Sequence, residues 1–320
     1  MVVVCERNAR CDFFIFYDIN TIYDMKKIII FGIKDVKLTL NNLLKKLDDK
    51  TIKEIIISEK LLGKGHYKNV FLIPNFPDFV LAVIRNLYDP EKSVKPFVIK
   101  RDLFPGQNFG QSVAESSSGL IIMKRVSGFS HGVQDWPSKI KIAHSGELLS
   151  TTDAIYFYNQ IKKLVLFPIK AYETFAMQLK KLADKNIRID AINPNNLLID
   201  DKDYSILIID FDTTSKPDDF SGCPNPVNSL YDMYCLLLDS KLHCYWINSL
   251  PDDLRKDFIE NCKKIIKKCK TAAISVGLNI NPDSTNYFFK TLSKNHPRLK
   301  LWKDYEAFIN LYKDFLTSKD

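Results

Sequence analysis

The sequence predicts an α+β protein of two lobes, in which a small β-rich part precedes a larger helical part. Short runs of β-branched and aromatic residues, broken by Gly, Pro and Asn, fill residues 52–85. After Gly128, apolar residues recur at three- and four-residue spacing, which is typical of amphipathic helices. Two short apolar runs, 197–199 and 206–209, interrupt the helices and predict a hairpin. The expected segments are an N-terminal extension (1–50), a small lobe ending in a hinge (51–126) and a helical lobe (127–320).

The strands expected in the small lobe are short and follow one another closely. Residues 55–57, 70–73 and 79–84 are β-prone runs, and residues 120–123 predict one more buried strand. Residues 86–118 are rich in Pro, Gly and Ser, and their secondary structure is the least clear from the sequence. Because consecutive short strands usually pair with their neighbours, we expect a meander.

Two amphipathic segments open the helical lobe. Residues 151–167 and 169–183 both carry apolar side chains at helical spacing. Thr151 or Thr152 is the expected N-cap of the first helix, because a hydroxyl can accept a bond from an unpaired N–H group. Pro168 separates the two helices, since proline disrupts a helix interior.

Composition argues against several classes of protein. The chain is 46% hydrophobic and 26% charged, which favours a globular protein over a disordered or fibrous one. The formal charge of +8 favours anionic partners, although we expect no nucleic-acid partner. Seven cysteines, an odd number without a CxxC pair, argue against a disulfide framework and a zinc site.

The apolar runs of the sequence are short. They fall well below the roughly 20 residues that a transmembrane helix needs, so no transmembrane segment is expected. We therefore expect a cytoplasmic protein. Delivery without a leader into a host cell cytosol would leave the same pattern.

Two glycines, Gly63 and Gly65, lie between β-prone runs. Glycines at this spacing let backbone amides approach phosphate oxygens that a side chain would block. A hairpin turn that uses glycine for its backbone angles would show the same pattern. The pair therefore indicates a phosphate-binding loop only in company with other motifs.

A carboxylate followed by an asparagine pair is the second motif. Asp190 precedes Asn195 and Asn196, which open an apolar run, and Asp210 follows one hairpin later. Transfer of a γ-phosphoryl group needs a carboxylate to orient the attacking hydroxyl and hard oxygen ligands to hold Mg²⁺. These residues supply those groups in that order.

In order and spacing, the motifs over residues 55–240 resemble those of the protein kinase superfamily. The resemblance implies a two-lobed protein-kinase-like fold, with a small β-rich N-lobe and a larger helical C-lobe, that binds ATP with Mg²⁺ or Mn²⁺. It makes Asp190 the catalytic residue and Asp210 a metal ligand. Met123 would be the gatekeeper, followed by a hinge that bonds the base through residues 124–126. The implied nucleotide-binding residues are Gly63, Gly65, Lys68, Val70, Arg85, Met123 and Arg125.

The phosphate-binding cation departs from the family pattern. Arg85 stands where the family has a lysine, and a planar guanidinium does not replace an ammonium freely. Lys68 stands at the third glycine position of the loop, where kinases of the with-no-lysine type place their phosphate-binding lysine. A solvated turn lysine is the alternative. The partner glutamate of this lysine is open between Glu91 and Glu115.

The metal-binding motifs depart as well. The family interval from the catalytic Asp selects Asn195, whereas the preceding proline and the following strand select Asn196, which we prefer. Asp212 replaces the last glycine of the DFG-like triplet. Asp232 resembles the helix aspartate that braces the catalytic loop, and the short segment before it resembles those of kinase-like bacterial effectors.

Three functions follow from these readings. The preferred one is an ATP-dependent protein kinase that phosphorylates Ser or Thr of a protein substrate. The second is a small-molecule phosphotransferase, as in the kinase-like aminoglycoside and choline phosphotransferases. The third is a catalytically inactive, kinase-like binding module, which Arg85 and Asp212 motivate and which the retained Asp190 and Asp210 oppose.

A basic stretch over residues 263–270 lies outside these motifs. Its lysines alternate with isoleucines and predict a helix with a basic face. Such a face is either solvated or binds an anionic lipid or an inositol phosphate. The lysines are Lys263, Lys264, Lys267, Lys268 and Lys270.

Overall fold

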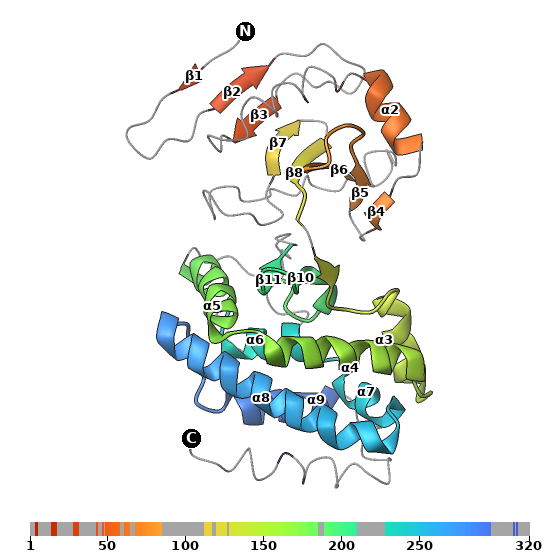
Figure 1. The fold of residues 1–320 in the computed structure, drawn as a ribbon, viewed down its shortest axis with the longest axis vertical. Helices are drawn as coiled ribbons and strands as arrows, with labels where there is room; N and C mark the ends of the chain where they lie inside the picture. The colour runs from red at the N-terminus through yellow and green to blue at the C-terminus, as the bar shows by residue number, and fades with distance from the viewer. Residues whose placement is uncertain are drawn as a thin grey trace. The chain divides into compact units, whose positions relative to one another are not determined.

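A computed structural model gives the fold of the chain as two compact units, Met1–Val126 and Ser127–Asp320. The first is built on a β-sheet and the second is mainly helical (Figure 1), which confirms the predicted mixed α+β class. The structure describes residues 4–5, 14–17, 28–31, 43, 47, 49–57, 61–64, 68–84, 112–116, 120–126, 128–184, 189–209, 228–295, 310 and 312.

Unit 1 holds a sheet whose described strands run in the order β1-β2-β3-β7-β8-β6-β5-β4. Every described pairing is antiparallel, and β3 joins the sheet by pairing with β7, so the first fifty residues contribute strands to the sheet of unit 1. The strands are β1 Val4–Cys5, β2 Phe14–Tyr17, β3 Ile28–Phe31, β4 Leu61–Lys64, β5 Lys68–Leu72, β6 Phe79–Ile84, β7 Ser112–Ser116 and β8 Leu120–Lys124.

The strand predicted at residues 55–57 is wrong, because these residues end a helix, α2 (Asp49–Ile57). Ile52 and Ile55 are both buried, and their spacing of three places them on one helical face. Lys50 and Glu54 form an exposed i,i+4 ion pair at 3.9 Å. Burial at helical spacing thus outweighs the β-propensity of the isoleucine run.

Unit 2 surrounds a small antiparallel sheet with helices. The sheet has the order β11-β10-β9, and β10 pairs with both neighbours. Its strands are β9 Phe129–Ser130, β10 Leu197–Asp200 and β11 Ser205–Ile208. The described helices are α3 Trp136–Ser145, α4 Thr151–Leu166, α5 Ile169–Asp184, α6 Leu230–Leu238, α7 His243–Ser249, α8 Asp252–Val276 and α9 Ser284–Asn295.

The first two amphipathic helices and the hairpin lie where the sequence predicts them, whereas the predicted N-cap is wrong by one residue. Helix α4 begins at Thr151, so the capping position falls on Ser150, whose hydroxyl accepts a long bond from Asp153 N at 3.5 Å. Pro168 separates α4 from α5 as expected. Lys268 closes the end of α4, because its Nζ donates to Val165 O at 2.7 Å and to Phe167 O at 2.5 Å.

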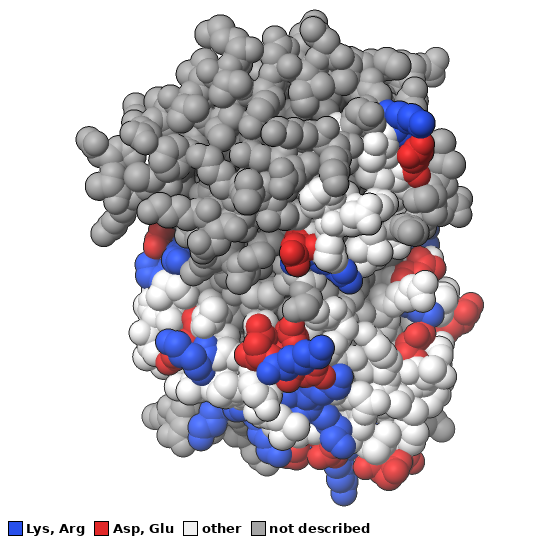
Figure 2. Space-filling view, turned by 45° about the horizontal axis from the view of Figure 1, so that its top comes forward, with Lys and Arg blue, Asp and Glu red and all other residues white. Residues whose placement is uncertain are grey.

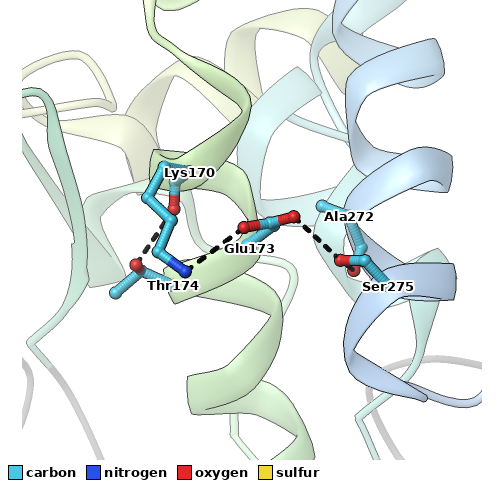
Figure 3. A network of polar contacts seen from close by, with 5 residues as sticks. All are labelled: Lys170, Glu173, Thr174, Ala272 and Ser275. Carbon is cyan, nitrogen blue, oxygen red and sulfur yellow. Dashed lines mark hydrogen bonds and ion pairs between the residues drawn. The ribbon is translucent and has the colours of Figure 1, made fainter.

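Helix α8 carries the basic stretch and packs against α4 and α5. Figure 3 shows part of the α5–α8 contact, where Glu173 accepts from Ser275 Oγ at 3.2 Å and pairs with Lys170 at 3.4 Å. Lys268 serves the α4 terminus and Lys263 pairs with Glu260 at 2.8 Å, so two of the five lysines are engaged within the unit.

The described surface has no broad patch of one charge sign on the face that Figure 2 shows. Lys and Arg side chains lie there among Asp and Glu side chains. Lys263 and Lys268 bond within the unit, and the structure gives no support to an anionic lipid or inositol phosphate at residues 263–270, which is one of the two alternatives for this stretch. Among the described helices, none is both long and apolar enough to cross a bilayer.

Candidate functional site

The loop from Ile189 to Asn196 leads from the α5 side of unit 2 into β10. Its last residues, Pro194–Asn196, form a single 3₁₀ turn. Asn193 caps the turn, since its side-chain oxygen accepts from Asn195 N at 3.0 Å, and Pro194 stands at the first turn position, where a missing N–H group costs no bond. The Asn-Pro-Asn-Asn order thus sets the local conformation that presents the asparagine pair.

Asn196 connects the parts of this loop that the sequence singles out. Its Nδ2 donates to Asp190 O at 2.9 Å, and its own backbone oxygen accepts from Ile209 N at 2.9 Å. The Asn196 residue is 6% exposed. Because a carbonyl can only accept, the bond to Asp190 orients the amide and leaves Oδ1 at the other end, where no described residue bonds it.

Asp190 is half-buried and its side chain is fixed locally. Its Oδ1 accepts from Ile192 N at 3.1 Å, which is an Asx-type turn. The loop therefore holds the carboxylate in a defined position on the same segment as Asn196. Asp210 follows Ile209 directly in the sequence and lies outside the described residues, as does Asp212.

Asn195 makes different contacts from Asn196, because both ends of its amide bond a neighbouring segment. Ser130 Oγ donates to Asn195 Oδ1 at 2.7 Å, and Asn195 Nδ2 lies 3.5 Å from Val133 O. Gly132 allows this approach, since a Cβ at that position would clash with the Asn195 side chain. Asn195 thus ties the loop to residues 130–133, a contact that sequence reasoning missed because it joins segments 65 residues apart.

His131 extends this contact into the helical core. Its backbone N–H donates to Leu197 O at 3.2 Å, and its Nε2 lies 2.6 Å from Leu237 O in α6. A carbonyl partner requires Nε2 to carry the proton. Burial lowers the pKa of His131 to about 4, so the ring is neutral near pH 7 and positions the backbone without adding charge.

Asp232 lies in the first turn of α6, where it caps the helix. Its carboxylate accepts from Ser229 N at 2.6 Å as part of a capping box. This contact explains why an aspartate stands here. The role predicted for it, as a brace of the catalytic loop, stays a prediction.

In unit 1, the structure brings Val70 and Met123 into one apolar cluster. Val70 lies opposite Ala82 across the β5–β6 pair and packs on the cluster that Val80, Ala82, Ile121 and Met123 form. Met123 is 7% exposed, near the end of β8. These are the residues that the kinase resemblance assigns to the adenine site.

Of the two candidate cations, the structure describes the backbone of Lys68 alone. Lys68 opens β5 and lies opposite Ile84, the last residue of β6, and Arg85 follows Ile84 in the sequence. Arg85 and Gly65 lie outside the described residues. Gly63 belongs to β4 at a register shift, and a Cβ there would meet no atom within 4 Å, so packing alone does not require glycine.

Two further candidate residues of unit 1 are partly described by the structure. The N–H group of Arg125 donates to Asp78 O at 2.7 Å and is engaged within the unit, whereas a role of Arg125 in nucleotide binding stays a prediction. Because neighbouring residues of a strand direct their N–H and C=O groups to opposite sides, those of Lys124 point away from β6. Glu115, one candidate for the lysine partner, lies in strand β7 and not in a helix, while Glu91 lies outside the described residues.

The residue types of the loop suit a hard metal ion. Mg²⁺ and Mn²⁺ prefer carboxylate and amide oxygens, which Asp190, Asn196 and Asp210 carry. The orientation of the Asn196 amide fits this use, because its nitrogen is occupied by Asp190 O. Within the described ranges, no group of three or more His, Cys, Asp or Glu side chains forms a metal cluster.

Comparison with known proteins gives weak structural similarity only. No family model matches the chain, and no curated protein matches it. The Mycobacterium tuberculosis PknI kinase domain is 17% identical with a TM-score of 0.34, over 67% of this chain and 94% of that one. Choline kinase LicA from Streptococcus pneumoniae is 11% identical with a TM-score of 0.26, over 80% of this chain and 99% of that one. TM-scores this far below 0.5 do not establish a shared fold.

Proposed function

We propose that the chain is a phosphotransferase that uses ATP with Mg²⁺ or Mn²⁺ and transfers the γ-phosphate to a hydroxyl of a protein substrate. One observation carries the proposal. Asn196 bonds Asp190 through its side chain and Ile209 through its backbone, each at 2.9 Å. Asn196, itself a predicted metal ligand, thus joins the predicted catalytic Asp190 to the strand that leads to Asp210.

Unit 2 would supply the chemistry in this proposal. Asp190 orients the attacking hydroxyl and accepts its proton, while the Asx-type turn at Ile192 holds the carboxylate in place. Asn196 and Asp210 hold the metal through oxygen atoms. A metal held by these residues would neutralise charge on the phosphates during transfer.

Unit 1 would supply the nucleotide contacts. Val70 and Met123 offer apolar surface to the base, and the carbonyl of Lys124 is a candidate acceptor for its amino group. Lys68, which lies opposite Ile84 across the β5–β6 pair, and Arg85, which follows Ile84 in the sequence, would contact phosphates as the kinase resemblance implies. The engaged N–H group of Arg125 takes no part.

Labelled ATP tests the proposal and its rivals in one experiment. Purified protein is incubated with γ-labelled ATP, Mg²⁺ or Mn²⁺ and a cell lysate, and the products are separated by size and acid-hydrolysed. Label in phosphoserine or phosphothreonine supports the protein kinase. Label in small molecules shifts the assignment to a small-molecule phosphotransferase. If no label is transferred, or if the same label is transferred by the Asp190→Ala variant, the inactive binding module is favoured.

A further inference from the structure

Strand β11 leads directly to Ile209 and is an edge strand of the sheet in unit 2, as far as the structure describes it. The backbone groups of Leu207 and Ile209 face β10, as the bond from Ile209 N to Asn196 O shows. Those of Ile206 and Ile208 point the other way, toward the edge. Both residues are buried, at 1% and 0% exposed, so their polar groups need partners other than water.

Gln178 of helix α5 supplies those partners. Its Nε2 donates to Ile206 O at 2.9 Å, and its Oε1 accepts from Ile208 N at 3.2 Å. The Gln178 residue is 1% exposed. One side-chain amide therefore makes the two bonds that a neighbouring strand would make, and it closes the edge of β11.

This contact fixes β11 from the side opposite to the candidate loop. Asn196 O holds Ile209 N on the β10 side, and Gln178 holds the residues before it on the helix side. The position of β11, which precedes Asp210 in the sequence, thus depends on the buried amide of Gln178, a residue that bonds neither the metal nor the substrate in this proposal. We infer that Gln178 is a positioning residue for the phosphotransfer site, and this inference rests on the proposed function.

The test combines Gln178→Leu with measurements that separate positioning from folding. Leucine has a similar size and leaves two buried backbone groups without partners. Hydrogen exchange of the peptide over residues 205–209 should speed up by tenfold or more. Mn²⁺ affinity of the full chain in the presence of ATP, measured by electron paramagnetic resonance, should fall about 10- to 100-fold, as for residues that orient metal ligands.

Asn261→Leu is the matched control. It removes a buried amide from α8 that bonds Asp257 Oδ2 at 3.0 Å, away from β11. It should lower stability without changing Mn²⁺ affinity or exchange in residues 205–209. Equal loss of Mn²⁺ affinity in both variants would reduce Gln178 to a general packing residue and overturn the inference.

Gln178→Glu keeps the test available if the leucine variant does not fold. A protonated carboxyl carries one donor and one acceptor, as the amide does, whereas a carboxylate has no donor for Ile206 O. Because burial raises the pKa of a carboxyl, the Mn²⁺ affinity of the variant should be close to that of wild type at pH 5 and should fall relative to wild type as the pH rises toward 9. A variant whose affinity is well below that of wild type at pH 5, or does not fall relative to wild type up to pH 9, contradicts the inference. If the wild-type protein binds no Mn²⁺ in the presence of ATP, both the proposed function and this inference fail. If a Gln178 variant changes hydrogen exchange without changing Mn²⁺ affinity, the inference alone is overturned.

Discussion

Replacing each asparagine of the candidate loop by alanine should affect stability and activity in opposite orders. Asn195→Ala removes the 2.7 Å bond from Ser130 Oγ and the longer contact with Val133 O, which should cost about 1–2 kcal/mol of unfolding free energy. Asn196→Ala removes one side-chain bond, to Asp190 O, and should cost about 1 kcal/mol. On stability alone, Asn195 is therefore the more sensitive position.

Activity should rank the two variants the other way. If Asn196 Oδ1 ligates the metal, Asn196→Ala removes a ligand and should lower turnover about 100-fold, equivalent to about 2.7 kcal/mol of barrier. Asn195→Ala should lower turnover less than about tenfold, because it loosens the loop without removing a ligand. Urea unfolding gives the first ranking, and phosphate transfer over a Mg²⁺ titration gives the second.

The matched control for this pair is Ser130→Ala, which removes the same hydrogen bond from its donor. It should lower stability no more than Asn195→Ala, because it keeps the contact with Val133 O, and the double variant should be less than additive because the two residues share one bond. A greater rise in the Mg²⁺ requirement for Asn195→Ala than for Asn196→Ala would refute the choice of Asn196. The family interval of five residues would then hold without an inserted residue.

Three further predictions follow from other parts of the chain. Asp210→Ala should abolish phosphate transfer and leave the urea unfolding curve unchanged, since the metal loses its carboxylate; wild-type turnover would refute the assignment. Lys68→Met should lower turnover at least as much as Arg85→Met, by about 100-fold, equivalent to roughly 2–4 kcal/mol. If Lys68→Met has no effect and Arg85→Met is inactive, Arg85 and not Lys68 contacts the phosphates. Burial raises the pKa of Asp239 from 3.8 to about 6, so the pKa in the folded protein exceeds that in the unfolded chain. The contribution of this group to the free energy of unfolding is therefore complete below pH 4 and falls by roughly 3 kcal/mol as the pH rises through 6. Urea unfolding of Asp239→Asn between pH 4 and 7.5 should lack this fall, and parallel curves for both proteins would contradict the assigned cause.

The elements that the sequence predicts well are those whose burial follows a local period. Residues 70–73 and 79–84 are short β-prone runs with turn residues between them, and they form β5 and β6. Helices α4 and α5 show the apolar spacing of their buried faces. Residues 49–57 fail because three consecutive isoleucines match strand propensity, while the buried positions, Ile52 and Ile55, follow a helical period that a short run does not reveal.

The site is less predictable than the fold, because its supporting contacts join distant segments. Sequence order places Asp190 before the asparagine pair, but it does not tell which amide reaches Asp190 O. Ser130 and Gln178 carry no motif, and each gains its role from a partner 65 or 28–30 residues away. The local signal that does exist is the Asn-Pro cap at Asn193, which predicts a tight turn that holds both Asn195 and Asn196.

The groups that hold the candidate loop are uncharged, and this bears on how the site would work. Ser130, Asn195 and Gln178 carry no charge, and His131 is neutral near pH 7 because burial lowers its pKa to about 4. A positively charged brace would lower the affinity of an adjacent metal ion by repulsion, and an anionic one would compete with the phosphates for the ion. Neutral braces fix the backbone while leaving the local field to the carboxylates and the nucleotide. Because none of these four groups titrates between pH 5 and 8, their hold on the loop should stay the same across that range.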